Sequence, residues 1–197
     1  MNLATFFTIS RVAIAPVFAF VFVAGYGSAD STWIWVCFTA AVLIELSDLM
    51  DGTLARARKE VTDFGKVVDP VADSVSRQTI FISFMLTGII PLWMYLIFFY
   101  RDAFMQLLRI VCASNGIVLA ARKSGKLKAV LQGAATFGVL IAIIVMHKST
   151  TGVQANIWWG QHPGFWIMLI PAIYTLLSVI DYVVPNRKLI IKAVKRK

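Results

Sequence analysis

The stretch SDLMDGTLARARKEVTDFGKVVDPVADS, residues 47–74, carries four aspartates in a chain that otherwise has few charges: Asp48, Asp51, Asp69 and Asp73. Asp48 and Asp51 are three residues apart, and Asp69 and Asp73 are four apart. Both spacings put a pair of side chains on one face of a helix. A short basic segment separates the two pairs, which predicts two neighbouring antiparallel helices whose carboxylates converge at a similar depth.

The composition around this stretch indicates a membrane protein. Of 197 residues, 59% are hydrophobic and 15% are charged, and the mean hydropathy is +0.77. Soluble domains are about 25% charged. A helix needs about 20 apolar residues to cross a bilayer. We therefore expect an all-α integral membrane protein formed by a single domain, residues 1–197, with six transmembrane helices at roughly 8–26, 33–55, 67–88, 91–113, 127–147 and 163–184.

The distribution of Lys and Arg predicts how these helices are oriented. The formal net charge is +9, and the cations gather near the N-terminus, in 56–66, in 122–128 and in the tail 187–197. The intervening loops, 27–32, 89–90 and 148–162, contain only Lys148. Because cytoplasmic loops are enriched in Lys and Arg, both termini are expected in the cytoplasm. No separate basic domain exists, which argues against nucleic-acid binding.

Four converging carboxylates would repel one another unless a cation neutralised them. Mg²⁺ and Mn²⁺ prefer oxygen ligands, and four carboxylates suit two ions better than one. The small residues Gly52 and Ala55 leave room for a ligand, Arg56 suits a phosphate, and Gly65 opens the next helix. A structural ion-pair cluster, a divalent-cation transporter and a non-catalytic scaffold are the alternatives, although cation transport needs neither the arginine nor the glycines.

With its spacing included, the stretch reads Asp48-x2-Asp51-Gly52-x2-Ala55-Arg56-x8-Gly65-x3-Asp69-x3-Asp73. This resembles the signature of the CDP-alcohol phosphotransferase family. The resemblance implies a six-helix homodimer of the bacterial cytoplasmic (inner) membrane, with its active site at the cytoplasmic face. It implies that a CDP-linked donor, typically CDP-diacylglycerol, is attacked by an alcohol and releases CMP.

The resemblance also implies roles for individual residues. Asp73 would be the general base. The metal ligands would be Asp48, Asp51, Asp69 and Asp73. The cytidine diphosphate part of the donor would contact Asp48, Gly52, Ala55, Arg56, Gly65 and Asp69.

The acceptor alcohol is predicted from cations outside the stretch. Candidates for binding an acceptor phosphate are Arg101, Arg109, Lys126 and Lys128. The spacing Arg101-x7-Arg109, followed by Gly125-Lys126-x-Lys128-x3-Gln132, resembles the phosphatidylglycerophosphate synthase branch, whose acceptor is glycerol 3-phosphate. Ser74 and Asp102 depart from that branch, so inositol phosphate and serine remain open as acceptors.

Other residues in and near the helices receive simpler interpretations. Topology alone would account for Lys126 or Lys128, and structural support is the alternative role for Arg101 and Arg77. Glu45, one turn deeper than Asp48, is a candidate second-layer group. Cys37 and Cys112 are expected to pack without a disulfide, and His147 and His162 to be polar residues at the membrane interface.

Overall fold

The computed structural model describes residues 3–58, 63–114, 123–149 and 159–195. Over these residues the chain forms six α-helices and one short 3-10 helix, η1 (Trp159–Gln161). The α-helices are α1 (Leu3–Gly25), α2 (Thr32–Arg58), α3 (Asp63–Leu86), α4 (Leu92–Ser114), α5 (Lys123–Ser149) and α6 (Pro163–Lys195). Each overlaps most of one of the six predicted segments, so the all-helical prediction is confirmed over the described residues.

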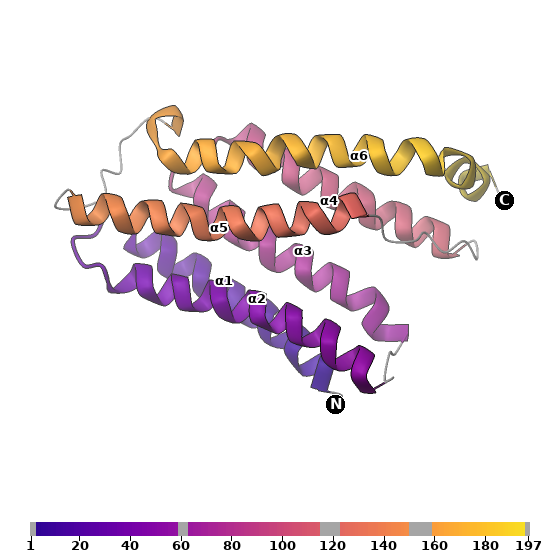
Figure 1. Ribbon diagram of the computed structural model, residues 1–197, viewed down its shortest axis with the longest axis horizontal. Helices are drawn as coiled ribbons and strands as arrows, with labels where there is room; N and C mark the ends of the chain where they lie inside the picture. The colour runs from indigo at the N-terminus through magenta and orange to yellow at the C-terminus, as the bar shows by residue number, and fades with distance from the viewer. Residues whose placement is uncertain (1–2, 59–62, 115–122, 150–158, 196–197) are drawn as a thin grey trace.

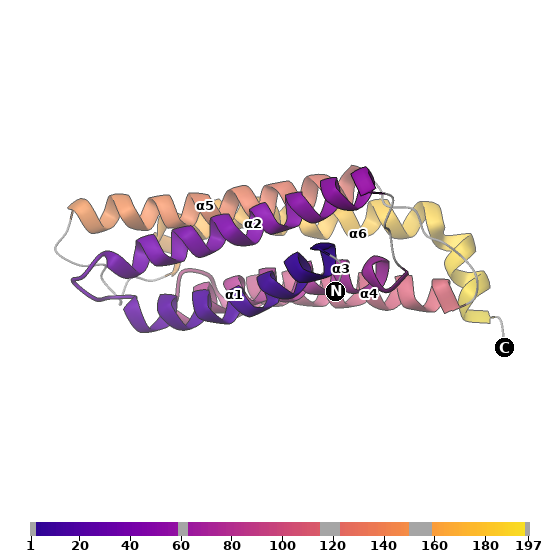
Figure 2. The same cartoon turned by 90° about the horizontal axis from the view of Figure 1, so that it is seen from below.

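The helices pack as two groups of three that share a long axis (Figure 1, Figure 2). In one group α1 contacts both α2 and α3, and in the other α6 contacts both α4 and α5. Contacts between α3 and α4 and between α2 and α5 join the groups. Both termini lie at the same end of the bundle, together with the last turns of α2 and α4 and the first turns of α3 and α5 (Figure 1). The candidate site residues lie in this half.

The opposite half is held by packed aromatic rings. Phe22 of α1 and Phe84 of α3 have ring centroids 5.2 Å apart, and Trp33 of α2 meets Phe22 edge-on at 5.5 Å. Phe81 and Phe98 join α3 to α4, with ring centroids 4.7 Å apart. These rings are almost entirely buried. They fix the helices at one end and leave the other end for polar groups.

The outer surface of the bundle is apolar. Large hydrophobic side chains stand exposed on every α-helix, as Phe20 on α1 and Ile170 on α6 illustrate, with 76% and 64% of their surface accessible. By length and composition, three stretches of the described residues are apolar enough to cross a membrane: Thr8–Gly25, Ser124–His147 and Pro163–Arg187. Helices α2, α3 and α4 carry charged residues of the candidate site among their apolar residues.

Burial describes the surroundings of three of these side chains. Cys37 and Cys112 are buried free thiols, as expected. His162 is 1% exposed, so its imidazole packs inside the protein. Its Nδ1 accepts a hydrogen bond from the Gly164 N–H at the start of α6, and burial lowers the pKa of its imidazole. His162 therefore shapes the turn before α6.

Candidate active site

The signature aspartates with described side chains lie on α2 and α3 near the end of the bundle that holds both termini. Asp48 and Asp73 line one small cavity together with Glu45 and Arg77. Asp69 lies one turn before Asp73 on α3. The structure thus brings carboxylates from both halves of the sequence motif to adjacent positions, because α2 and α3 both pack against α1.

Each of these aspartates is held by a polar side chain. Arg11 of α1 donates from Nη1 to Oδ1 of Asp48, and Thr8 of the same helix donates to Oδ1 of Asp69 at 2.8 Å. Arg77 donates to Oδ1 of Asp73 at 2.7 Å. Its other terminal nitrogen donates to the Ala129 carbonyl of α5 at 2.8 Å. Helix α1 thereby orients two carboxylates, and Arg77 links a third to the second group of helices.

Glu45 lies one turn deeper than Asp48 and lines the same cavity. Helix α5 approaches it closely, since a Cβ atom at Gly133 would lie 3.0 Å from Glu45 Oε1. Glycine at 133 therefore leaves the space that the Glu45 carboxylate fills. This position behind Asp48 and Asp73 suits the second-layer role expected for Glu45.

An all-carboxylate donor set fits a hard divalent cation. Within the described residues, no three His, Cys, Asp or Glu side chains are close enough to hold a metal ion. The side chain of Asp51, the fourth expected ligand, lies outside the residues whose side chains are described. Asp48, Asp69 and Asp73 supply the oxygen donors that such an ion prefers, and their assembly with Asp51 into a ligand set stays a prediction.

The motif residues between the two aspartate pairs have described backbones only. Gly52, Ala55 and Arg56 belong to the last turns of α2, and Gly65 belongs to the first turn of α3. Their side-chain surroundings, like those of Asp51, lie outside what the structure describes. Their roles toward the donor stay predictions.

A second, larger cavity opens between α3, α4, α5 and α6. Its volume is about 250 Å³, and its lining brings together Asp73 and all four cations expected to bind an acceptor phosphate: Arg101, Arg109, Lys126 and Lys128. Among the described signature aspartates, only Asp73 lines both this cavity and the smaller one. We call Asp48, Asp69 and Asp73 the carboxylate cluster, and the cavity lined by the four cations the basic cavity. Asp73 belongs to both.

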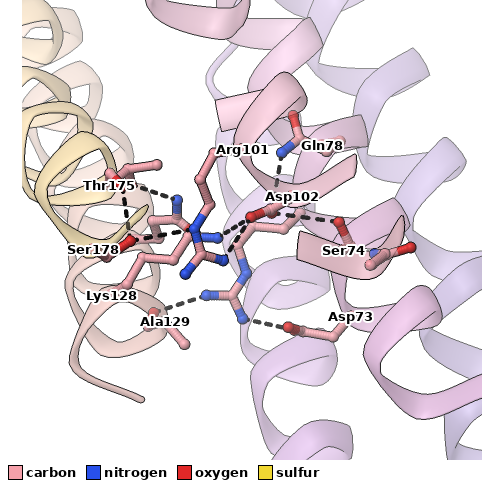
Figure 3. Close-up of polar contacts among 12 residues, drawn as sticks. Asp73, Ser74, Gln78, Arg101, Asp102, Lys128, Ala129, Thr175 and Ser178 are labelled. Atoms are coloured by element: carbon pink, nitrogen blue, oxygen red, sulfur yellow. Dashed lines mark hydrogen bonds and ion pairs between the residues drawn. The ribbon is translucent and has the colours of Figure 1, made fainter. Parts of the chain in front are cut away.

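The four cations of this basic cavity fall into two kinds. Arg101 and Lys128 are mostly buried, and both donate to Asp102 (Figure 3). Arg109 and Lys126 are exposed, and no ion pair is recorded for either with another described residue. Asp102 was expected to pair with either Arg101 or Arg77; it pairs with Arg101, and Lys128 joins the same carboxylate.

A family model described as CDP-alcohol phosphatidyltransferase matches residues 1–184. The chain belongs to this family.

Curated relatives carry two kinds of name. A Treponema pallidum protein named CDP-diacylglycerol–glycerol-3-phosphate 3-phosphatidyltransferase is 27% identical, covering 92% of this chain and 88% of its own. A Bacillus subtilis protein of the same name is 30% identical, covering 71% of this chain and 77% of its own. A Mycobacterium tuberculosis protein named as a cardiolipin synthase is 25% identical, covering 87% and 81%. The named activity thus differs among relatives of comparable identity.

Several polar residues of the site were not assigned roles from the sequence. Thr8 and Arg11 contact signature aspartates, and Ser74, Gln78 and Ser178 surround Asp102 and Arg101. For Arg11 a signal was available, because a charged residue in an apolar helix is costly and usually functional. The hydroxyl and amide residues give no such signal, since they are common in membrane helices.

Proposed function

We propose that this chain transfers the phosphatidyl group of CDP-diacylglycerol to the hydroxyl of glycerol 3-phosphate, forming phosphatidylglycerophosphate and releasing CMP. One observation carries the proposal: Asp73 lies at the wall of a cavity that Arg101, Arg109, Lys126 and Lys128 also line. A carboxylate beside several cations suits an alcohol that carries a phosphate. The names of the Treponema and Bacillus relatives agree with this acceptor.

In this reaction Asp73 is the general base. Its carboxylate takes the proton of the acceptor hydroxyl as the alcohol oxygen bonds to the phosphatidyl phosphorus. The phosphoanhydride bond then breaks, and its electrons leave with CMP. The hydrogen bond from Arg77 fixes the Asp73 carboxylate while leaving it partly exposed. A base held in place loses less entropy on reaching the reactive geometry.

The remaining signature residues bind the donor. Asp48, Asp51, Asp69 and Asp73 would hold two Mg²⁺ or Mn²⁺ ions, which would offset the negative charge of the pyrophosphate oxygens. Gly52, Ala55, Arg56 and Gly65 would contact the cytidine diphosphate part, together with Asp48 and Asp69. Arg11 would keep the Asp48 carboxylate oriented, and Thr8 would do the same for Asp69.

The membrane arrangement follows from the same features. All six helices span a bacterial inner membrane, with both termini and the active site at the cytoplasmic face. The basic residues gathered at that end support this orientation. The acyl chains of the donor stay in lipid while CMP and glycerol 3-phosphate exchange with the cytosol. The functional unit is a homodimer.

The deciding experiment is an acceptor panel. Purified protein in detergent-lipid micelles receives CDP-diacylglycerol, Mg²⁺ and one acceptor: glycerol 3-phosphate, inositol phosphate, serine or phosphatidylglycerol. We expect CMP release and phosphatidylglycerophosphate only with glycerol 3-phosphate. CMP release with phosphatidylglycerol alone would instead assign a cardiolipin synthase activity. Metal flux in proteoliposomes without CMP release from any acceptor would favour a transporter.

A further inference from the structure

Asp102 of α4 is a buried carboxylate that accepts hydrogen bonds from four side chains. Its Oδ1 receives Lys128 Nζ of α5 and Arg101 Nη1, the latter at 3.1 Å. Its Oδ2 receives Ser74 Oγ and Gln78 Nε2 of α3, each at 3.3 Å. Figure 3 shows these donors converging on the one carboxylate from three helices. Few acceptor positions remain on Asp102 for a ligand.

The contacts extend to the fourth helix around the basic cavity. Arg101 Nε donates to Ser178 Oγ of α6 at 3.2 Å. Nearby, Gln132 of α5 donates to Thr175 of α6, also at 3.2 Å. Arg101 is thus held at both ends of its guanidinium, and the wall of the cavity is tied to α3, α4, α5 and α6 together (Figure 3).

The charges explain why a carboxylate belongs beside a site for an anion. Two buried cations, Arg101 and Lys128, flank one anion, so this wall keeps a net positive charge. Without Asp102 the two cations would repel each other in a low-dielectric setting and turn toward solvent. Ser74 connects this wall to the proposed base, because it donates to Asp102 and directly follows Asp73 in α3.

We propose that Asp102 is a positioning residue for the acceptor: it holds Lys128 and Arg101 against the cavity wall so that they meet the acceptor phosphate at a fixed distance from Asp73. This inference rests on the proposed function. A purely structural role, in which Asp102 only staples α3, α4 and α5 together, predicts lower stability without a preference between the two substrates.

The test compares three variants with wild type in the micellar assay. Asp102→Asn keeps the shape and removes the charge, whereas Asp102→Glu keeps the charge. Asp30→Asn is the matched control, because Asp30 is exposed and accepts a hydrogen bond from the Thr32 N–H at the start of α2. The start of α2 lies at the other end of the bundle (Figure 1). Asparagine caps helices as well as aspartate does. Initial rates are measured against glycerol 3-phosphate and against CDP-diacylglycerol separately.

We expect Asp102→Asn to raise KM for glycerol 3-phosphate about tenfold or more, while KM for CDP-diacylglycerol changes less than about twofold. Asp102→Glu should stay within about threefold of wild type for both substrates, since it can still accept from both cations. Asp30→Asn should match wild type. Equal changes in both KM values, or a fall in kcat alone, would overturn the positioning role.

A double variant covers the case in which Asp102→Asn alone fails to fold. Asp102→Asn with Lys128→Met removes one charge of each sign and leaves no unpaired ammonium. It should fold, and its KM for glycerol 3-phosphate should exceed that of Lys128→Met alone, because Arg101 also loses its carboxylate partner. A double variant with the same KM as Lys128→Met alone overturns the inference and leaves the proposed function intact. A wild-type chain that releases no CMP overturns both.

Discussion

Aspartates form ion pairs with arginines in two regions of this protein, and the exposure of the aspartate side chains differs between the two regions. Asp48 and Asp73 pair with Arg11 and Arg77, yet 44% and 36% of their side-chain surfaces remain accessible. Asp102 pairs with Arg101 and Lys128 and keeps only 8%. The signature aspartates are held on one side and open on the other, whereas Asp102 is enclosed.

Under the proposed function, the difference in exposure separates carboxylates that bind a metal ion or a proton from a carboxylate that positions its neighbours. An exposed carboxylate with a fixed orientation can still take a metal ion or a proton, because part of its surface is free of protein contacts. A carboxylate enclosed by four donors can only order those donors. The carboxylate cluster and the basic cavity therefore use aspartate in opposite ways, and Asp73 with Arg77 belongs to both.

Among the tests of this comparison, removing divalent metal should change CMP release the most. Chelation with EDTA is expected to abolish CMP release, because the signature carboxylates need a cation to accept the pyrophosphate. Excess Mg²⁺ or Mn²⁺ should restore it. The measurement is CMP release before and after metal is returned. Full activity in EDTA would show that the carboxylate cluster works without metal.

Asp73→Asn should come next. Loss of a general base costs typically 10²–10⁴-fold in rate, so we expect kcat to fall at least about a hundredfold. Circular dichroism should show unchanged helix content, because the side chain is partly exposed and asparagine still accepts from Arg77. Asp30→Asn serves again as the control for the same chemical change. Activity above about a tenth of wild type would remove Asp73 as the base.

Arg77→Met tests the link between the two regions. It removes hydrogen bonds of 2.7 Å to Asp73 and 2.8 Å to the Ala129 carbonyl. Hydrogen bonds to charged groups contribute about 1.5–3 kcal/mol, so the loss should lower the melting temperature by several degrees. The measurement is thermal unfolding in detergent. An unchanged melting temperature would mean that Arg77 does not couple α3 to α5.

Arg109→Gln should have the smallest effect. Arg109 is exposed at the basic cavity, so its removal should cost the acceptor phosphate one charge-assisted contact, or about tenfold in KM for glycerol 3-phosphate. The donor KM and kcat should barely change. Arg187→Gln, an exposed cation of α6 outside the cavity lining, is the matched control. If both substitutions raised KM for glycerol 3-phosphate equally, Arg109 would contribute only general positive charge and no specific contact with the acceptor.

Much of the fold and part of the site could be read from local patterns. Six apolar stretches of spanning length predicted six helices, and each α-helix overlaps most of its predicted segment. The spacing of Asp69 and Asp73 fixed their shared face, since helix periodicity is a local property. Arg101, Arg109, Lys126 and Lys128 were singled out because a neutral acceptor needs fewer cations and because their spacing resembles the phosphatidylglycerophosphate synthase branch.

The partners of these residues could not be read in the same way. Arg11 and Asp48 are 37 residues apart, and Asp102 and Lys128 are 26 apart. Such pairs depend on how α1 packs against α2 and how α4 and α5 flank the basic cavity, which no local spacing encodes. The burial of His162 is another case, because it depends on the start of α6.

The sequence by itself determined the chemistry of this protein: its helices, its family signature and the charges it places among apolar residues. Helix periodicity and the cost of charge in lipid act over a few residues, so they are visible in the chain. Only the tertiary structure decided which cations are tied to Asp102 and which carboxylates stay open. Those outcomes follow from contacts between distant helices, where burial and geometry choose the partner.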